Sequence, residues 1–195
     1  MAVKGETLTA PTVYLGKPGY ENTDEVFKLA KSRAKELGIK TILVASTRGE
    51  AAVQAVSYFK GCKVIAVSHP ANYKEPNTQE FTEENRKTFE ANGGILVTAA
   101  LPFRGGAGAT LRIKYNLRTE GDIMADTLRI FGQGMKVAVE IGVMAADAGV
   151  VRVDESVISI AGTTKGADTC IVLKPAASMS FFDTRVQEVV CKPRL

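Results

Sequence analysis

Short apolar runs rich in β-branched residues alternate with amphipathic segments along most of this chain. Residues 41–44 (TILV) form the first clear run, and a polar turn at residues 46–49 follows it. Residues 50–59 then repeat apolar side chains at helical spacing, before a second apolar run at residues 63–67. A strand, a helix and a second strand in this order predict two parallel strands joined by a right-handed crossover.

The alternation continues on both sides of this unit. Apolar spacing predicts helices at residues 23–37, 82–89, 123–131 and 135–148. Further strands are expected at residues 95–100, 156–160, 169–173 and 186–190, the last as a closing edge strand. Residues 104–115 show no clear pattern, and residues 12–15 allow a short strand within an irregular lead-in at residues 1–20.

These elements predict an α/β fold of three layers, α/β/α, around a mostly parallel central sheet. The last strand or strands are expected to run antiparallel at the edge, because only a short turn separates residues 156–160 from residues 169–173. A chain of 195 residues suits a single domain, here taken as residues 1–195. In such sheets, ligands bind beyond the carboxyl ends of the strands.

Composition excludes several classes of function. The net charge is +4, and the basic residues are scattered without the basic stripe that nucleic-acid binding needs. No apolar run approaches the ~20 residues of a membrane span, so no membrane partner is expected. A small positive excess is compatible with a small anionic ligand.

Cysteine and histidine usage adds two expectations. The three cysteines lack metal-ligand spacing and are interpreted as buried, reduced thiols, which favours a cytoplasmic location. The single histidine, His69, argues against a Ser-His-Asp triad and against a site built from several histidines, so no metal is expected. Placed after the second strand of the unit, His69 is either a structural surface residue or part of a site beside the first turn.

The first turn is a candidate anion site. It combines two hydroxyls, a guanidinium and a glycine at the mouth of a helix, in the residues Ser46, Thr47, Arg48 and Gly49. Unpaired backbone N–H groups and the helix dipole favour an anion at such a position, and a guanidinium adds a bidentate contact to phosphate. Ser46 either contacts the ligand or only caps the helix.

A second turn is the strongest local signal. It comprises Gly162, Thr163, Thr164, Lys165, Gly166, Ala167 and Asp168. A minimal hairpin does not need so many hydrogen-bond donors, so these residues are interpreted as ligand-binding, with a solvated polar loop as the alternative.

Three further features have open interpretations. The glycine-rich residues 104–108 suit either an anion nest or a mobile flap. Phe103 and Tyr115 are candidates to stack on a flat ring, with core packing as the default. Glu140 and Asp147 share one face of a helix, as a paired acid site or as carboxylates with capping and hydrogen-bonding roles.

The order of these elements resembles the C-terminal α/β domain of pyruvate kinase. The matching residues lie at positions 41–46, 49, 52, 63–68, 160–162 and 169–173. The catalytic barrel of pyruvate kinase has no counterpart here, so kinase activity is not implied. In that family the first turn holds a sugar phosphate through hydroxyl side chains at the positions that Arg48 and Ala51 occupy in this chain.

The resemblance is greatest to free-standing relatives of this domain, which have no assigned activity, and it implies flavin mononucleotide (FMN) as the ligand. We expect Thr163, Thr164, Gly166 and Ala167 to bind the phosphate or polar chain. Ser46, Thr47 and Arg48 then line the facing side, and His69 and Phe103 lie near the ring. A flavin-dependent oxidoreductase and a regulatory module that senses a phosphorylated metabolite are the alternatives, and a homo-oligomer is a further possibility.

Overall fold

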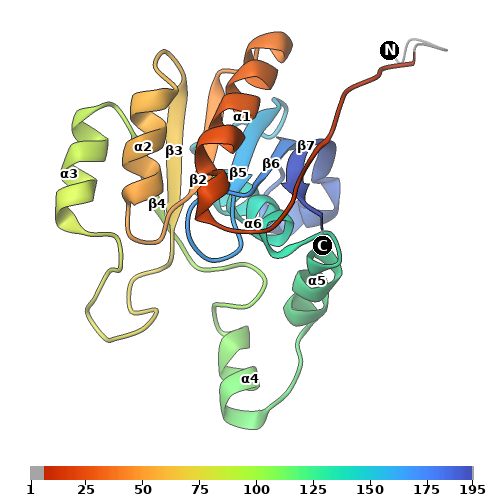
Figure 1. The fold of residues 1–195 in the computed structure, drawn as a ribbon. Coiled ribbons are helices and arrows are strands. Elements are labelled where there is room, and N and C mark those ends of the chain that lie inside the picture. The colour runs from red at the N-terminus through yellow and green to blue at the C-terminus, as the bar shows by residue number, and fades with distance from the viewer. Residues whose placement is uncertain (1–6, 195) are drawn as a thin grey trace.

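The apolar runs pair into one seven-stranded sheet, in the order β1-β7-β6-β5-β2-β3-β4 (Figure 1). The computed structural model describes residues 7–194. The strands are β1 (Val13–Leu15), β2 (Thr41–Ala45), β3 (Lys63–Ser68), β4 (Ile95–Thr98), β5 (Val157–Ala161), β6 (Thr169–Lys174) and β7 (Arg185–Pro193). Neighbouring strands pair in parallel, except that β6 is antiparallel to both β5 and β7.

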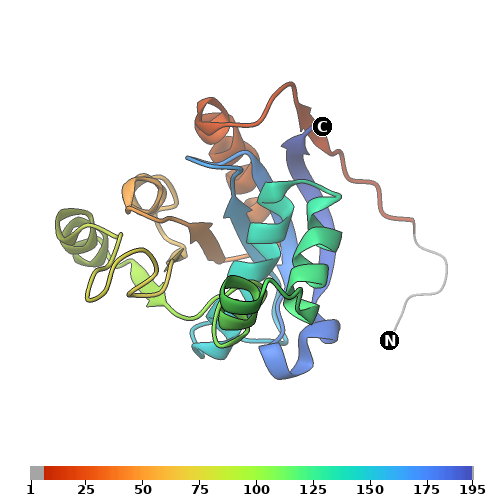
Figure 2. The same cartoon turned by 90° about the horizontal axis from the view of Figure 1, so that it is seen from below.

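Helices cover both faces of this sheet. They are α1 (Thr23–Leu37), α2 (Glu50–Tyr58), α3 (Glu83–Ala91), α4 (Gly108–Tyr115), α5 (Glu120–Arg129) and α6 (Gln133–Asp147), with short 3-10 turns η1 (Tyr20–Asn22) and η2 (Ser178–Asp183). Figure 2 shows α1 and α2 on one side of the sheet and α6 on the other. This arrangement confirms the expected three-layer α/β/α class.

Each face has its own core. Apolar side chains of α1, α2 and α3 pack on the first face, including Phe27, Phe89 and Phe59, the residue that follows α2. The second face is covered by α6, which is buried along most of its length, as its nearly uniform apolar sequence predicts. α5 packs on α6, whereas α4 contains no buried residue and lies below the sheet in Figure 1.

Several details differ from the sequence prediction. β1 pairs outside β7, so the strand near the N-terminus, and not residues 186–190, is outermost. Part of the segment without a clear pattern folds as α4. α5 begins three residues early because Thr119 caps it, with Asp122 completing a capping box. Residues 1–6 of the expected lead-in lie outside the described residues.

The topology brings two distant turns to one rim. β2, β3 and β5 run in the same direction, so the segments that follow them leave the sheet at the same edge. β6 is antiparallel to β5, and therefore begins where β5 ends. The turn at residues 162–168 thus lies at the same rim as the turn at residues 46–49.

Candidate functional site

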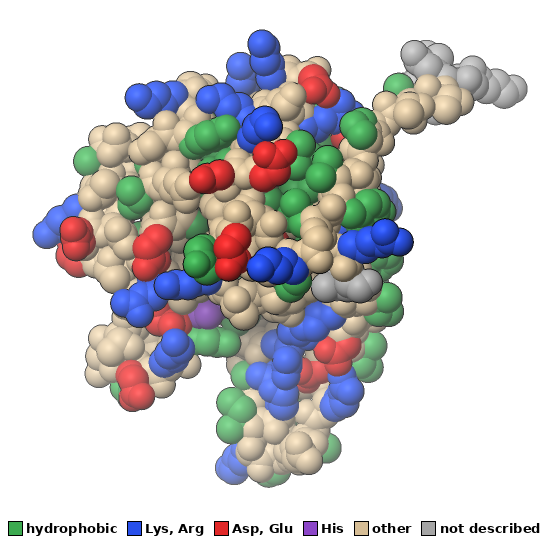
Figure 3. All heavy atoms as spheres, viewed as in Figure 1, with side chains coloured by type: hydrophobic (Ala, Val, Ile, Leu, Met, Phe, Trp, Pro, Cys, Tyr) green, Lys and Arg blue, Asp and Glu red, His purple; other side chains and the backbone are tan. Residues whose placement is uncertain are grey.

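A cleft of about 1030 Å³ opens at this rim, and we call it the rim cleft. Both glycine-bearing turns line it, together with the segment after β3, the start of α1 and one side of α6. Figure 3 shows a hollow between the body of the molecule and the segment that carries α4, with the purple side chain of the single histidine at its edge. The predicted convergence of the two turns is therefore what the structure shows.

The first turn is built around a left-handed glycine. Gly49 has φ 106°, and a Cβ at this position would lie 2.4 Å from the Cβ of Asn85, so the turn needs glycine. Ser46 is buried, and its Oγ accepts a hydrogen bond from the backbone N–H of Ala52, one of the N–H groups in the first turn of α2 that lack a partner within the helix. Ser46, Thr47 and Arg48 line the rim cleft, whereas Gly49 lies behind them.

The second turn is held closed by a buried carboxylate. Asp168 is fully buried, and its Oδ2 accepts hydrogen bonds from the backbone N–H of Gly19 and from both the N–H and the hydroxyl of Thr163. Its Oδ1 accepts a further hydrogen bond from the hydroxyl of Thr169. Asp168, predicted as a binding residue, does not line the rim cleft but organises the turn behind it.

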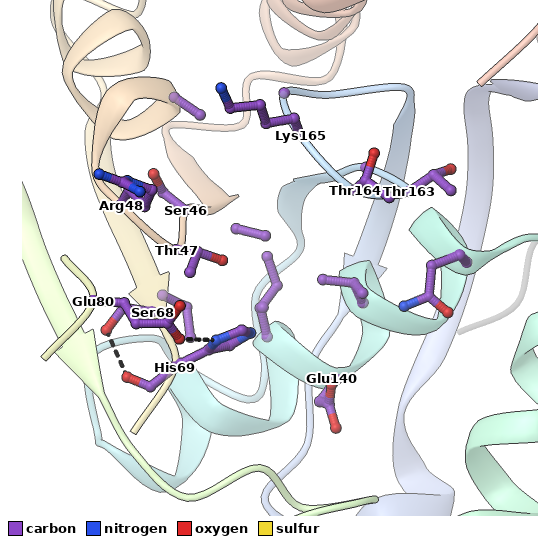
Figure 4. A pocket seen from close by; sticks show the side chains of 18 of the residues that line it. Ser46, Thr47, Arg48, Ser68, His69, Glu80, Glu140, Thr163, Thr164 and Lys165 are labelled. Atoms are coloured by element: carbon purple, nitrogen blue, oxygen red, sulfur yellow. Dashed lines mark hydrogen bonds and ion pairs between the residues drawn. The ribbon is translucent and has the colours of Figure 1, made fainter. Parts of the chain in front are cut away.

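The same turn is anchored to the start of α1. The backbone N–H of Ala167 donates to the hydroxyl of Thr23, so Ala167 is also buried behind the rim cleft. Gly166 has φ 67°, and a Cβ there would lie 2.5 Å from the same hydroxyl. Thr164 and Lys165, at the tip, are exposed and line the rim cleft, as Figure 4 shows.

His69 belongs to a polar cluster on the other wall of the rim cleft. Its Nδ1 lies 2.7 Å from Oε2 of Glu80, and its ring packs on Tyr73. Because an ionised carboxylate only accepts hydrogen bonds, Nδ1 is the donor in this contact. Burial raises the pKa of Glu80, but hydrogen bonds from Lys74 and His69 outweigh it, so the pKa lies below its ordinary value.

The lower part of the rim cleft is a basic recess that the sequence prediction did not assemble. Its members come from the segment after β4 and from α4, α5 and α6, and we call it the basal recess: Leu101, Arg104, Arg112, Arg129, Lys136 and Glu140. Lys136 and Glu140 form an ion pair, and both side chains are more than nine-tenths buried. The i, i+4 placement of two charges on an otherwise apolar helix was the signal in the sequence.

Phe103 does not line the rim cleft. It is 4% exposed and packs edge-on against Phe181, at 5.2 Å between ring centroids. Core packing, the default interpretation of the sequence, therefore describes it. Lys136 Nζ lies 5.7 Å from the centre of the same ring, so Phe103 supports the basal recess from behind.

Of the two interpretations of Glu140 and Asp147, the structure favours separate hydrogen-bonding roles. Glu140 is buried beside Lys136, whereas Asp147 is exposed and its Oδ1 accepts a hydrogen bond from the backbone N–H of Ser178. The two carboxylates thus have the separate hydrogen-bonding roles that the sequence left open. Within residues 7–194, no group of three His, Cys, Asp or Glu side chains is placed to hold a metal ion, and no helix is long and apolar enough to cross a membrane.

Residues 24–173 match the family model described as "Pyruvate kinase, alpha/beta domain". This chain belongs to that family. The match spans every strand from β2 to β5 and most of β6, and so includes both glycine-bearing turns of this pyruvate kinase alpha/beta domain.

Two solved structures of O-ureido-L-serine synthase, one of them a mutant bound to O-ureido-L-serine, are also similar. Each is 18% identical to this chain, with a TM-score of 0.30 over 69% of this chain and 49% of the other. This pyruvate kinase alpha/beta domain therefore spans about half the length of those chains.

An ion network links the basal recess to α5 of this pyruvate kinase alpha/beta domain. The side chain of Asp122 is buried and pairs with Arg104 at 2.9 Å and with Arg112 at 3.2 Å. The pKa of Asp122 lies below its ordinary 3.8, and the largest cause is the hydrogen bond from the backbone N–H of Thr119. Burial raises the pKa, but the Thr119 hydroxyl and the guanidinium groups of Arg104 and Arg112 lower it further. Asp122 thus holds two of the recess arginines in place.

This lowered pKa predicts an acid-dependent loss of stability. The unfolded state takes up a proton at Asp122 near pH 3.8 while the folded state resists it, so the contribution is complete above that pH and lost as the pH falls below it. Urea unfolding at pH 7, 5, 4 and 3 is expected to show a smaller pH dependence for Asp122→Asn than for the native chain. Asp183→Asn, at an exposed position, serves as the control; equal pH profiles for all three proteins would contradict the prediction.

Proposed function

We propose that this chain binds a phosphate-bearing nucleotide in the rim cleft, with FMN as the first candidate. The observation that carries the proposal is the meeting of two glycine-bearing turns, 46–49 and 162–166, at one cleft beyond the carboxyl ends of parallel strands. Hydroxyls, backbone N–H groups and a helix N-terminus in one place favour a phosphate.

The size and lining of the rim cleft support a nucleotide. Its volume of about 1030 Å³ is at the upper end of the range for small-molecule sites. Apolar side chains of α6 also line it, namely Val137, Ile141 and Met144. Polar groups at the turns and this apolar wall suit a ligand with an anionic end and a flat ring.

The charge around the rim cleft favours an anion. Seven Lys or Arg residues and five Asp or Glu residues line it. Several of these cations are already paired with acids, but Lys165 stands exposed at the tip of the second turn, and no ion pair is recorded for it within residues 7–194. We expect Lys165 and the hydroxyl of Thr164 to contact the phosphate.

A flavin titration tests this assignment. The protein, stripped of any bound ligand, is titrated with FMN and followed by flavin fluorescence and by its visible spectrum. The double substitution Thr164→Ala and Lys165→Ala removes two charge-assisted or polar contacts and is expected to weaken FMN binding by about tenfold or more. The matched control replaces Lys87 and Thr88 of α3 by alanine. These two consecutive residues are exposed and do not line the rim cleft, so the affinity for FMN is expected to stay unchanged.

Two results would contradict the proposal. Native protein that does not bind FMN in this titration contradicts the flavin, and equal affinity of the double variant and the native chain contradicts the role of the second turn. Bleaching of a bound flavin by a reduced nicotinamide would favour the oxidoreductase alternative. Thermal stabilisation by sugar phosphates without flavin binding would favour the sensor.

Location and assembly are subordinate proposals. The free, buried thiols of Cys170 and Cys191 support the cytoplasm, where reducing conditions maintain thiols. We propose a homo-oligomer, because apolar side chains on and beside α4 and α5 are exposed: Ile113, Tyr115, Leu117, Ile123, Ile130 and Phe131. Light scattering on the purified protein measures its mass directly, and a monomer at all concentrations would contradict it.

A further inference from the structure

One buried carboxylate oxygen in the basal recess has no partner. Oε2 of Glu140 pairs with Nζ of Lys136 one turn earlier on α6. Oε1 of the same carboxylate is buried and has no hydrogen-bond partner within the described residues. The Glu140 side chain is 4% exposed, yet the residue lines the rim cleft.

An unsatisfied buried carboxylate oxygen calls for a physical reason. Buried polar groups are nearly always hydrogen-bonded, because leaving one unpaired sacrifices its interaction with water. Lys136 satisfies only one of the two carboxylate oxygens of Glu140. The Phe103 ring, whose centre lies 5.7 Å from Lys136 Nζ, has no N–H or O–H group to donate. A ligand that brings an N–H or O–H into the basal recess would complete the hydrogen bonding of Glu140.

Glu140 and Lys136 offer an acceptor and a cationic donor side by side. Lys136 supplies an ammonium group on one side. Burial is the main cause that lowers the pKa of Lys136 from its ordinary value, and the ion pair with Glu140 opposes this shift. The unpaired Oε1 of the Glu140 carboxylate is an acceptor on the same group that holds this ammonium.

We propose that Lys136 and Glu140 recognise the imide edge of the flavin ring. This inference rests on the proposed FMN binding and specifies which part of the ligand enters the basal recess. The imide N3–H donates to Oε1 of Glu140, and Lys136 donates to a neighbouring ring carbonyl oxygen. An imide edge has an N–H donor beside a carbonyl acceptor, which complements the unpaired carboxylate oxygen of Glu140 and the ammonium group of Lys136.

The rest of the rim cleft suits this orientation. Val137 and Ile141, on the same helix, present apolar surface for the ring. In Figure 4, Glu140 extends from α6 on the side away from Thr164 and Lys165. The two polar ends of the rim cleft are therefore separate, as the phosphate end and the imide end of one flavin require.

A flavin methylated at N3 tests the proposal on the native protein. The methyl group removes the imide donor and leaves the phosphate, the ribityl chain and the rest of the ring unchanged. We expect native protein to bind N3-methyl-FMN at least about tenfold more weakly than FMN. This comparison uses no variant, so it does not depend on how substitutions in the recess fold.

Two double variants locate the effect. Lys136→Met with Glu140→Leu removes the recognising pair, and is expected to bind the two flavins within about twofold of each other. Thr164→Ala with Lys165→Ala is expected to weaken both flavins while keeping the tenfold ratio between them. Equal binding of FMN and N3-methyl-FMN by the native protein would overturn the imide assignment and leave the proposed function intact; no binding of FMN would overturn both.

Discussion

Replacing Asp168 by alanine is expected to cost about 3 kcal/mol of unfolding free energy. The change removes the acceptor of four hydrogen bonds, whose donors are Gly19, Thr163 through two groups, and Thr169. Each buried donor left without a partner costs about 1–3 kcal/mol, and partial access of water to the turn limits the sum. Urea unfolding followed by circular dichroism measures the loss.

Asparagine at the same position separates hydrogen bonding from packing. Asp168→Asn retains one oxygen for the three donors at Oδ2, and the hydroxyl of Thr169 is able to accept from the new amide. We therefore expect a smaller loss, about 1–2 kcal/mol. Asp183→Ala, at an exposed position, is the control and is expected to stay within about 0.5 kcal/mol. Equal losses for the alanine and asparagine variants would mean that the hydrogen bonds do not stabilise the turn.

Breaking the Lys136–Glu140 pair is the second large effect. Glu140→Ala leaves a buried ammonium without its counter-ion, and such a change costs about 3–5 kcal/mol. The double variant with Met at 136 and Leu at 140 removes both charges and keeps the volume, so it is expected within about 1 kcal/mol of the native chain. Chemical denaturation at pH 7 compares the three proteins. A double variant as unstable as Glu140→Ala would show that packing, and not the unpaired charge, causes the loss.

The same variants have a distinct pH dependence. The pKa of Lys136 lies below its ordinary 10.5, chiefly through burial, while Glu140 opposes this shift. Between the folded pKa and 10.5 the unfolded state binds more protons, so stability rises with pH in that range. Removing Glu140 lowers the folded pKa further, and we expect a larger rise in stability toward alkaline pH, beginning at lower pH, for Glu140→Ala. The double variant lacks the lysine and lacks this rise.

Local patterns predicted the meeting of the two turns because direction in a sheet follows from connection length. The helix between residues 41–44 and 63–67 requires that these two strands run parallel. The short turn before residues 169–173 requires that this strand runs antiparallel to residues 156–160. Together with the parallel pairing of β2 and β5, these two facts place both turns at one edge. The sequence did not separate ligand-facing residues from supporting ones, because the carboxylate of Asp168 has the same chemistry whether it binds a ligand or fastens a turn.

The sequence by itself determined the layers, the parallel sheet and the rim at which the glycine-bearing turns meet, since each depends on periodicity and on the length of connections. Only the tertiary structure decided the basal recess. Arg104, Arg112 and Arg129 lie on separate segments, and the pairing of the first two with Asp122 depends on how α4 and α5 fold back beside α6. It also decided that Glu140 keeps an unpaired oxygen, because burial and hydrogen-bond partners depend on what packs around a side chain.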